Sequence, residues 1–212
     1  MHHNLLMVFI KNPVRGQVKT RLAKGLGEEF ALQIYRNLLN LTLKVTSTLE
    51  VDRQVWYSKF IPDQDPWATA GFVPKIQQGD DLGERMYTAF QKNLDKGYSN
   101  IIIIGSDSPE ITTSYIEKAF ELLENCDAVI GPANDGGYFL LGLKQLDKRI
   151  FSNKKWSTSS VFSDTIKDFE NLGWQWERLS QLMDLDTMKD WGKIKNKKRF
   201  LNPGGVHVKD ED

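Results

Sequence analysis

Asp107 is the residue whose position most directly suggests chemistry. It follows four consecutive isoleucines, at positions 101–104, whose β-branched run predicts a strand buried on both faces of a parallel sheet. In an open α/β sheet, ligands bind outside the carboxyl ends of the strands, so this carboxylate is expected at a ligand-binding crevice. A carboxylate there could coordinate a divalent ion that also binds the phosphates of a nucleotide on its other side. The alternative is that Asp107 only caps the next helix.

Four cations follow the first predicted strand. Lys11, Arg15, Lys19 and Arg21 lie between that strand and the first predicted helix. A loop in this place lies at the carboxyl edge of the sheet, where lysine and arginine side chains suit phosphate oxygens. The sequence contains neither the G-x-G-x-x-G pattern nor a P-loop, so a phosphate site here follows another design. A solvated basic turn is the alternative.

A polar run precedes another predicted helix and is expected at the same sheet edge. It contains Gln77, Gln78, Asp80 and Asp81, with Gly79 among them. Side-chain hydrogen bonds from this run could read a nucleobase, while the glycine allows a flat ligand to approach closely. The alternative is that the run only caps the helix that follows.

Asp135, Gly136, Gly137 and Tyr138 stand between two predicted strands. Two adjacent glycines after an aspartate are typical of a tight hairpin turn. Alternatively, the glycines leave room for a ligand while Asp135 offers its carboxylate to a hydroxyl group or a metal ion. Periodicity does not choose between these interpretations.

A second acidic site lies near the end of the chain. Asp184 and Asp186 are two residues apart in a segment expected to be extended, and Thr187 can cap a terminal helix after them. Alternate residues of an extended segment share a face, so both carboxylates could contact one cation. Paired aspartates before a helix are also ordinary capping residues.

Alternating elements must position these groups. Pro62, Pro66 and polar residues predict a loop after the second strand, and Ser157, Thr158 or Ser159 is expected to cap the helix after Trp156. The apolar patterns predict strands over 5–10, 54–58, 75–78, 101–104, 127–132, 138–143 and 175–179, and helices over 27–49, 112–124, around 86–94, around 161–169 and after 187.

Composition sets the class of protein. The 212 residues suit a single α/β domain over 1–195, with a charged, glycine-containing tail over 196–212 that we expect to be flexible. Lys and Arg total 28, as do Asp and Glu, and this balance argues against a nucleic-acid binder. The single cysteine, Cys126, fits a reducing compartment. No apolar run reaches the roughly 18 residues of a membrane span, and no signal peptide is evident, so a cytoplasmic protein without membrane contact is expected.

Six blocks together resemble the bacterial DUF2064, or selenodomain-associated, transferases. They are KNPVRGQVKTRLAKGLG, QGDDLGERM, IIIIGSDSP, VIGPANDGGYFLLGL, KKWSTSSV and MDLDTMKDW, in the family's order between about Phe9 and Trp191. That family is glycosyltransferase-A-like and similar to molybdenum-cofactor guanylyltransferases and phospholactate guanylyltransferase. The resemblance implies the nucleotide-diphospho-sugar transferase fold, a Rossmann-like three-layer α/β/α sandwich. Its sheet is mixed and mostly parallel, with a short antiparallel element.

The resemblance also implies roles for individual residues. It places Lys11, Arg15, Lys19 and Arg21 near the nucleotide's phosphates, and it gives Lys19, Arg21 and Asp107 a part in catalysis. It assigns Asp107, Asp184 and Asp186 to the binding of Mg²⁺ or Mn²⁺. It places Gln78 and Gly79 near the base, and Asp135, Gly136, Gly137 and Tyr138 near the acceptor or sugar. Two positions depart from the family. Ser108 stands where cysteine is common, and Lys189 stands where an acidic residue is common.

Three functions remain open on these grounds. Nucleotidyl transfer from a nucleoside triphosphate to a phosphorylated acceptor is favoured slightly by the basic loop and the DLDT segment. Glycosyl transfer from a nucleotide-sugar to a small acceptor is the alternative. A third alternative is a nucleotide-binding protein without catalysis. Neither the base, the acceptor nor the oligomeric state follows from the sequence.

Overall fold

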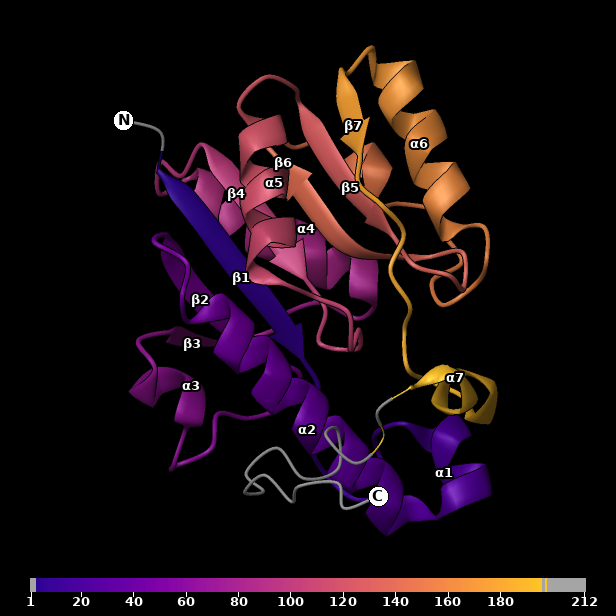
Figure 1. Cartoon of the computed structure of the whole chain (residues 1–212). Helices are drawn as coiled ribbons and strands as arrows, with labels where there is room; N and C mark the ends of the chain where they lie inside the picture. The colour runs from indigo at the N-terminus through magenta and orange to yellow at the C-terminus, as the bar shows by residue number, and fades with distance from the viewer. Residues whose placement is uncertain (1–2, 196, 198–212) are drawn as a thin grey trace, which may run out of the picture.

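The computed structural model describes residues 3–195 and residue 197; the rest of the expected tail over 196–212 lies outside the described residues. Within this part of the chain, seven strands form one sheet (Figure 1). The strands are β1 (Asn4–Ile10), β2 (Asp52–Tyr57), β3 (Val73–Ile76), β4 (Asn100–Ile104), β5 (Ala128–Pro132), β6 (Tyr138–Leu143) and β7 (Trp176–Arg178).

The strand order, β3-β2-β1-β4-β6-β5-β7, determines where a ligand can bind. Strand β6 is antiparallel to β4 and β5, and the other pairs are parallel. The chain passes from β1 to β2 and β3 on one side and then returns to β4 on the other side of β1. The carboxyl ends of β1 and β4 therefore meet at a topological switch point, where open α/β sheets bind ligands.

Helices cover both faces of this sheet, which gives the three expected layers. The described helices are α1 (Thr20–Leu26), α2 (Glu28–Thr46), α3 (Pro66–Thr69), α4 (Leu82–Leu94), α5 (Thr113–Leu123), the 3₁₀ helix η1 (Lys148–Ile150), α6 (Val161–Leu172) and α7 (Met188–Lys193). Helices α2 and α5 contribute to the apolar cluster on one face, and α4 and α6 to that on the other. None of the helices in the described part of the chain is both long and apolar enough to cross a membrane.

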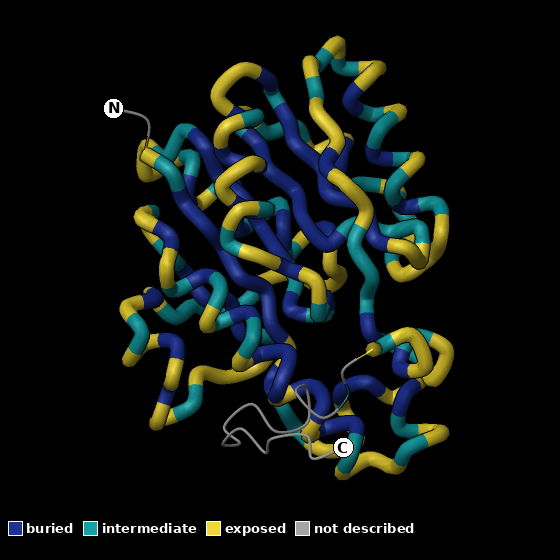
Figure 2. Tube along the Cα trace, in the orientation of Figure 1, coloured by how far each residue is buried: buried dark blue, intermediate teal, exposed yellow. Residues whose placement is uncertain are grey.

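The alternation of strand β1 shows how the two apolar layers arise. Leu6 and Val8 belong to the cluster that contains α2 and α5, whereas Leu5 and Met7 belong to the cluster that contains α4 and α6. All four side chains are fully buried, and Figure 2 shows burial along the central strands of the sheet. Full burial stabilises by about 1.5–3 kcal/mol for each such side chain, which is why these strands are continuous apolar runs.

A third, smaller cluster joins the end of the described chain to its beginning. Leu185 and Trp191 pack with Leu22 of α1 and with Ile34 and Leu38 of α2. In Figure 1 the segment after β7 runs as an extended chain to α7, which lies beside α1. The acidic DLD segment, residues 184–186, is therefore held next to the loop that follows β1.

Most predicted elements are present, and the differences are local. The basic segment contains a short helix, α1. A turn at Gly27, where φ is +83°, separates α1 from α2. Thr112, not Asp107, caps α5 through its side chain. Asp81 caps α4, which agrees with the alternative given for the polar run, and Thr187 caps α7, as expected. Helix α6 begins after Ser160, whose side chain makes no capping hydrogen bond, so the expected cap at 157–159 is wrong.

The substitution Leu185→Ala should destabilise the protein by about 2–5 kcal/mol, because it leaves a cavity among α1, α2 and α7. Urea unfolding measures the loss. Leu82→Ala is the matched control. Leu82 is 43% exposed, so its substitution should lower the free energy of unfolding clearly less. Equal losses in the two variants would show that the third cluster does not hold the DLD segment.

Candidate functional site

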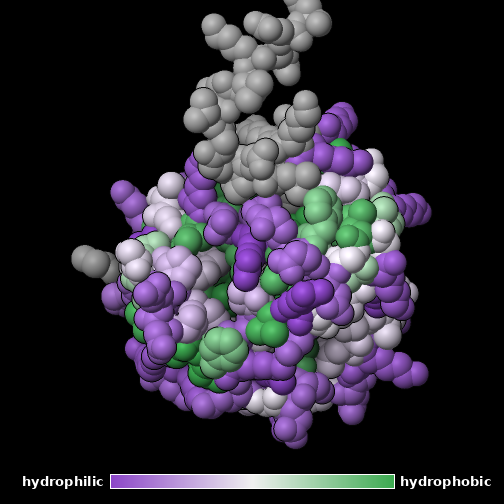
Figure 3. Space-filling view, turned by 90° about the horizontal axis from the view of Figure 1, so that it is seen from below, coloured by the Kyte–Doolittle hydropathy of each residue, from purple (hydrophilic) through white to green (hydrophobic). Residues whose placement is uncertain are grey.

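A cavity of about 860 Å³ opens at the carboxyl ends of β1 and β4. It is lined by the loop after β1, the residues after β4, the turn between β5 and β6, residues 156–158 and the DLD segment. Figure 3 looks from below onto this end of the molecule, where hydrophilic side chains surround a few hydrophobic ones. The volume is within the range of small-molecule sites, and the switch point is where such a site is expected.

Lys19 and Asp107 form an ion pair inside the cavity. Lys19 Nζ lies 2.7 Å from Asp107 Oδ1, and the lysine side chain is only 4% exposed whereas the aspartate side chain is 50% exposed. Lys19 directly precedes α1 and has φ 49°, in the left-handed region that residues other than glycine rarely adopt. The pair thus combines a fixed, buried cation with a carboxylate that still faces the cavity.

The pKa values of two aspartates move in opposite directions. Burial would raise the pKa of Asp107, but the Lys19 ammonium, with a smaller contribution from Lys11, holds it below the usual value. Burial raises the pKa of Asp184 to about 7, and the nearby carboxylates of Asp107 and Asp135 add to the shift. Asp184 therefore lies in a poorly solvated place beside other carboxylates, and both conditions favour its protonated form.

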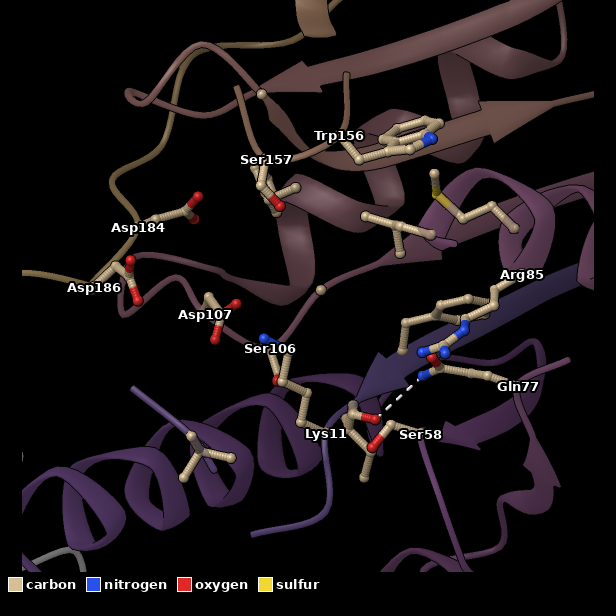
Figure 4. Close-up of a pocket in the computed structure, with 18 of the residues that line it drawn as sticks. Lys11, Ser58, Gln77, Arg85, Ser106, Asp107, Trp156, Ser157, Asp184 and Asp186 are labelled. Carbon is tan, nitrogen blue, oxygen red and sulfur yellow. Dashed lines mark hydrogen bonds between the residues drawn. The ribbon is translucent and has the colours of Figure 1, made fainter. Parts of the chain in front are cut away.

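The DLD segment is attached directly to the end of β4. The backbone N–H of Leu185 donates a hydrogen bond to the carbonyl oxygen of Asp107 at 3.0 Å, and Asp184 and Asp186 on either side of it line the cavity. Arg21 Nη1 lies 3.3 Å from Asp186 Oδ2. Figure 4 shows Asp107, Asp184 and Asp186 on one side of the cavity, opposite Gln77 and Arg85.

These carboxylates fit a divalent ion that shares its ligands with a substrate. In the described part of the chain, no three His, Cys, Asp or Glu residues already form a metal-holding group. Asp184 Oδ1, however, is buried without a hydrogen-bond partner, and a cation is the partner that a buried carboxylate oxygen lacks. Oxygen ligands from phosphates and water complete the coordination of such ions in many nucleotide-binding sites.

The structure brings most of the predicted residues together. The predicted residues that line the cavity are Lys11, Lys19, Asp107, Asp135, Gly137, Tyr138, Asp184 and Asp186. Those outside the lining, among the residues that the structure describes, are Arg15, Arg21, Gln78, Gly79 and Gly136. The carboxylates and two of the four basic-loop cations thus share one site, whereas the predicted base-reading pair does not contribute to it directly.

The basic loop divides between the cavity and the surface. Arg15 pairs with Glu28 at 3.2 Å and with Glu29 at 3.8 Å, and its side chain is 64% exposed. Arg21 reaches the site only through Asp186. The Lys11 and Lys19 side chains are thus the two cations that this loop presents to a ligand.

Gln77 lines the cavity, whereas Gln78 does not. The Gln77 side-chain amide donates hydrogen bonds to the carbonyl oxygens of Ile10 at 3.1 Å and Trp56 at 2.8 Å. Gln78 accepts a hydrogen bond from Lys92 outside the cavity, and the Gly79 carbonyl oxygen accepts one from Arg85 Nε at 2.9 Å. Adjacent residues of an extended segment point to opposite sides, so only one of the two glutamines faces the cavity. The sequence pattern alone did not indicate which one.

The DGG segment is both a turn and part of the cavity. Asp135 Oδ1 accepts a hydrogen bond from the backbone N–H of Gly137 at 2.9 Å, and the segment joins the antiparallel strands β5 and β6. Gly136 has φ +89°, and a Cβ added there would lie 2.3 Å from the carbonyl oxygen of Ser159. Gly136 therefore allows the chain before α6 to pack against this turn.

Some lining residues were not recognised as functional from the sequence. Asn12, Ser58, Lys59, Arg85, Trp156 and Ser157 belong to this group. Ser157 has φ 65°, and strained residues of this kind concentrate at functional sites. Trp156 and Ser157 belong to the KKWSTSSV block, and Arg85 belongs to the QGDDLGERM block. Their place in these two blocks was the signal in the sequence that could have identified these residues as functional.

A family model described as "Uncharacterized protein conserved in bacteria (DUF2064)" matches residues 41–158. The chain is 30% identical over 133 residues to a 2-phospho-L-lactate guanylyltransferase of Methanocaldococcus jannaschii. That match covers 61% of this chain and 56% of the relative, so it spans little more than half of the relative's length.

Solved structures share the fold. A protein of Desulfovibrio desulfuricans G20, described as a nucleotide-diphospho-sugar transferase, has 30% identity and a TM-score of 0.83, with coverage of 97% of this chain and 90% of that chain. A cytidylyltransferase of Leptospira borgpetersenii has 13% identity and a TM-score of 0.59, with coverage of 90% and 84%. The fold is thus the expected nucleotide-diphospho-sugar transferase fold, a glycosyltransferase-A-like α/β sandwich.

The raised pKa of Asp184 predicts a pH-dependent stability. Its folded-state pKa of about 7 lies above its ordinary value of 3.8, so the native state binds one more proton than the unfolded state between these pH values. Stability should fall as the pH rises from 4 to 7. Asp184→Asn removes this titration and should be more stable than wild type at pH 8, by on the order of 3 kcal/mol, but not at pH 4.

Urea unfolding at several pH values measures this difference. Asp63→Asn, at an exposed aspartate, corrects for the general effect of removing a negative charge. A gain in the free energy of unfolding for Asp184→Asn that is the same at pH 4 and pH 8 would contradict the prediction.

Proposed function

The chain belongs to the DUF2064 family, and from that premise and the geometry of its cavity we propose that it is a nucleotidyltransferase. It binds a nucleoside triphosphate with Mg²⁺ or Mn²⁺ and transfers the nucleotidyl group to a small phosphorylated acceptor. The observation that carries this proposal is that the cations of the β1 loop and the carboxylates of the β4 and DLD segments line one cavity at the switch point.

The charges of this cavity suit a metal–polyphosphate complex. Lys11 and Lys19 supply cations for phosphate oxygens, and Lys59 and Arg85 add two more to the lining. Asp107, Asp184 and Asp186 lie together, opposite Arg85, and would hold the divalent ion beside Lys19 (Figure 4). When bound, that ion would neutralise phosphate charge and polarise the phosphoryl group.

The proposed reaction needs positioning and charge stabilisation more than a protein nucleophile. An oxygen of the acceptor's phosphate attacks the α-phosphorus of the nucleoside triphosphate. The bond from this phosphorus to the oxygen that bridges it to the β-phosphorus breaks, and pyrophosphate leaves. Lys19 is held by Asp107 and is buried, so it contributes a preorganised positive charge near the transferring group. The exposed Lys11 side chain provides a mobile one.

The known relatives support two versions of this chemistry. The guanylyltransferase relative supports nucleotidyl transfer. The Desulfovibrio protein, which is similar over nearly the whole chain, favours transfer of a sugar from a nucleotide-sugar as the second candidate function. Both reactions would use the same carboxylates and cations, so the donor substrate is what separates them.

Calorimetric binding across the four ribonucleoside triphosphates, their diphosphates and a set of nucleotide-sugars, with and without Mg²⁺ or Mn²⁺, tests the proposal. Metal-dependent binding of one triphosphate, with pyrophosphate release once an acceptor is supplied, is the expected result. Preference for a nucleotide-sugar would establish the second candidate. Binding of nucleotide that does not change with metal would support the non-catalytic alternative, and no binding at all would overturn both transferase proposals.

The variant Asp107→Asn should abolish the metal dependence of nucleotide binding and lower kcat/KM by about 100-fold or more, because one proposed metal ligand becomes a neutral amide. Isothermal calorimetry and a pyrophosphate assay measure the two effects. Asp63→Asn is the control, and urea unfolding of each variant separates a loss of function from a loss of folded protein. A folded Asp107→Asn protein with wild-type metal dependence would contradict the assigned ligand.

Lys19→Gln should weaken triphosphate binding by about tenfold or more, since it removes the buried cation nearest to Asp107. Lys24→Gln is the matched control, because Lys24 is an exposed lysine of α1, the helix that Lys19 precedes, and does not line the cavity. The two dissociation constants are compared at equal ionic strength, since phosphate binding depends on salt. Equal weakening in both variants would indicate a general charge effect and not a specific contact.

A further inference from the structure

Tyr35 of α2 lies buried beneath the basic loop and contacts the groups that define the cavity. The residue is only 2% exposed, yet it is part of the cavity lining. Its helix lies beside β1 (Figure 1), and its hydroxyl reaches the first residue after that strand. None of the sequence patterns distinguished this tyrosine from the apolar residues of the helix.

The hydroxyl of Tyr35 holds the backbone of Lys11 on both sides. It accepts a hydrogen bond from the Lys11 N–H at 2.9 Å and donates one to the Lys11 carbonyl oxygen at 3.0 Å. Ser106 Oγ lies 3.4 Å away, next to Asp107. One side chain thus satisfies both backbone groups of Lys11 where the β1 strand has ended and no ladder partner remains.

The ring of Tyr35 supports the second cation of the loop. Lys19 Nζ lies 5.9 Å from the ring centroid and 2.7 Å from Asp107 Oδ1. The ammonium is therefore placed between an aromatic face and a carboxylate, which is a favourable arrangement for a buried cation. These contacts help to hold Lys19 in its left-handed backbone conformation, which would otherwise be unfavourable.

The hydroxyl keeps its proton across the physiological pH range. Burial, together with the nearby negative charge of Asp107, raises the pKa of Tyr35 well above its ordinary value. Tyr35 is therefore a neutral donor and acceptor and contributes no charge of its own. Its effect on a ligand comes through Lys11 and Lys19.

We infer that Tyr35 is the positioning residue that preorganises Lys11 and Lys19 for a polyphosphate. The identity of the bound group rests on the proposed function, whereas the contacts that hold the loop do not. Tyr35→Phe removes only the oxygen and should release the Lys11 backbone while the ring stays in place. The loop would then have to be ordered by the ligand, so binding of the polyphosphate should weaken.

The test compares Tyr35→Phe with Tyr57→Phe. Tyr57 is equally buried, and its hydroxyl donates a hydrogen bond of 2.5 Å to Asp65, so the control also removes a buried, hydrogen-bonded hydroxyl. Two quantities are measured on the full chain. They are the hydrogen exchange rate of the Lys11 amide, by NMR, and the dissociation constant for inorganic tripolyphosphate, by calorimetry.

For Tyr35→Phe we expect Lys11 amide exchange to accelerate by about tenfold or more, and tripolyphosphate binding to weaken by about five- to tenfold. Tyr57→Phe should change neither quantity, even if both variants shift the urea midpoint by similar amounts. Unchanged Lys11 exchange in Tyr35→Phe, or equal weakening of binding in both variants, would overturn the inference.

The two proposals can fail separately. If wild type binds neither tripolyphosphate nor any nucleotide while Lys11 exchange still accelerates in Tyr35→Phe, then the proposed function fails and Tyr35 only orders the loop, which overturns its role in ligand binding. If wild type binds nucleotide with metal and Tyr35→Phe binds it equally well, the proposed function stands and the inference about Tyr35 fails.

Discussion

The ion pair between Lys19 and Asp107 is the interaction on which the rest of the site depends. It joins the loop after β1 to the loop after β4 at the point where the strand order changes direction. Because the lysine is buried and the aspartate is half exposed, loss of Asp107 would leave an uncompensated buried charge, whereas loss of Lys19 would leave a carboxylate that water still reaches. Such a pair is weak evidence for stability but a strong constraint on geometry. Lys19 makes this contact from a backbone conformation that is unusual for lysine.

A second constraint comes from the end of the described chain. The apolar contacts of Leu185 and Trp191 with α1 and α2 hold the end of the extended segment after β7. The hydrogen bond from Leu185 to the Asp107 carbonyl oxygen then sets the register of the segment. Asp184 and Asp186 consequently face the same cavity as Asp107. An apolar cluster and the backbone hydrogen bonds of Asp184 and Leu185 thus help to bring the carboxylates together.

Cations and carboxylates lie side by side in the cavity and differ in rigidity. Lys19 is a fixed cation paired with Asp107, whereas Lys11 is exposed. Tyr35 contacts the Lys19 ammonium with its ring and the Lys11 backbone with its hydroxyl. Burial, together with the nearby carboxylates, raises the pKa of Asp184. A ligand that carries both a divalent ion and phosphates would complement these groups. Such complementarity is the physical basis for assigning nucleotide chemistry to this member of the family.

The sequence by itself determined the order of the elements and the main charged groups of the site. The isoleucine run before Asp107, the apolar run before Lys11 and the capping residue Thr187 are local patterns, and burial and hydrogen bonding act on them wherever they occur. The distinction between Gln77 and Gln78, the surface position of Arg15 and the inclusion of Arg85 and Ser157 were decided only by the tertiary structure. Which way a loop side chain points depends on contacts with segments distant in the chain, such as Ile10 and Trp56 for Gln77. A single sequence does not contain those distances, because they arise only when the sheet has formed and the loops pack against one another.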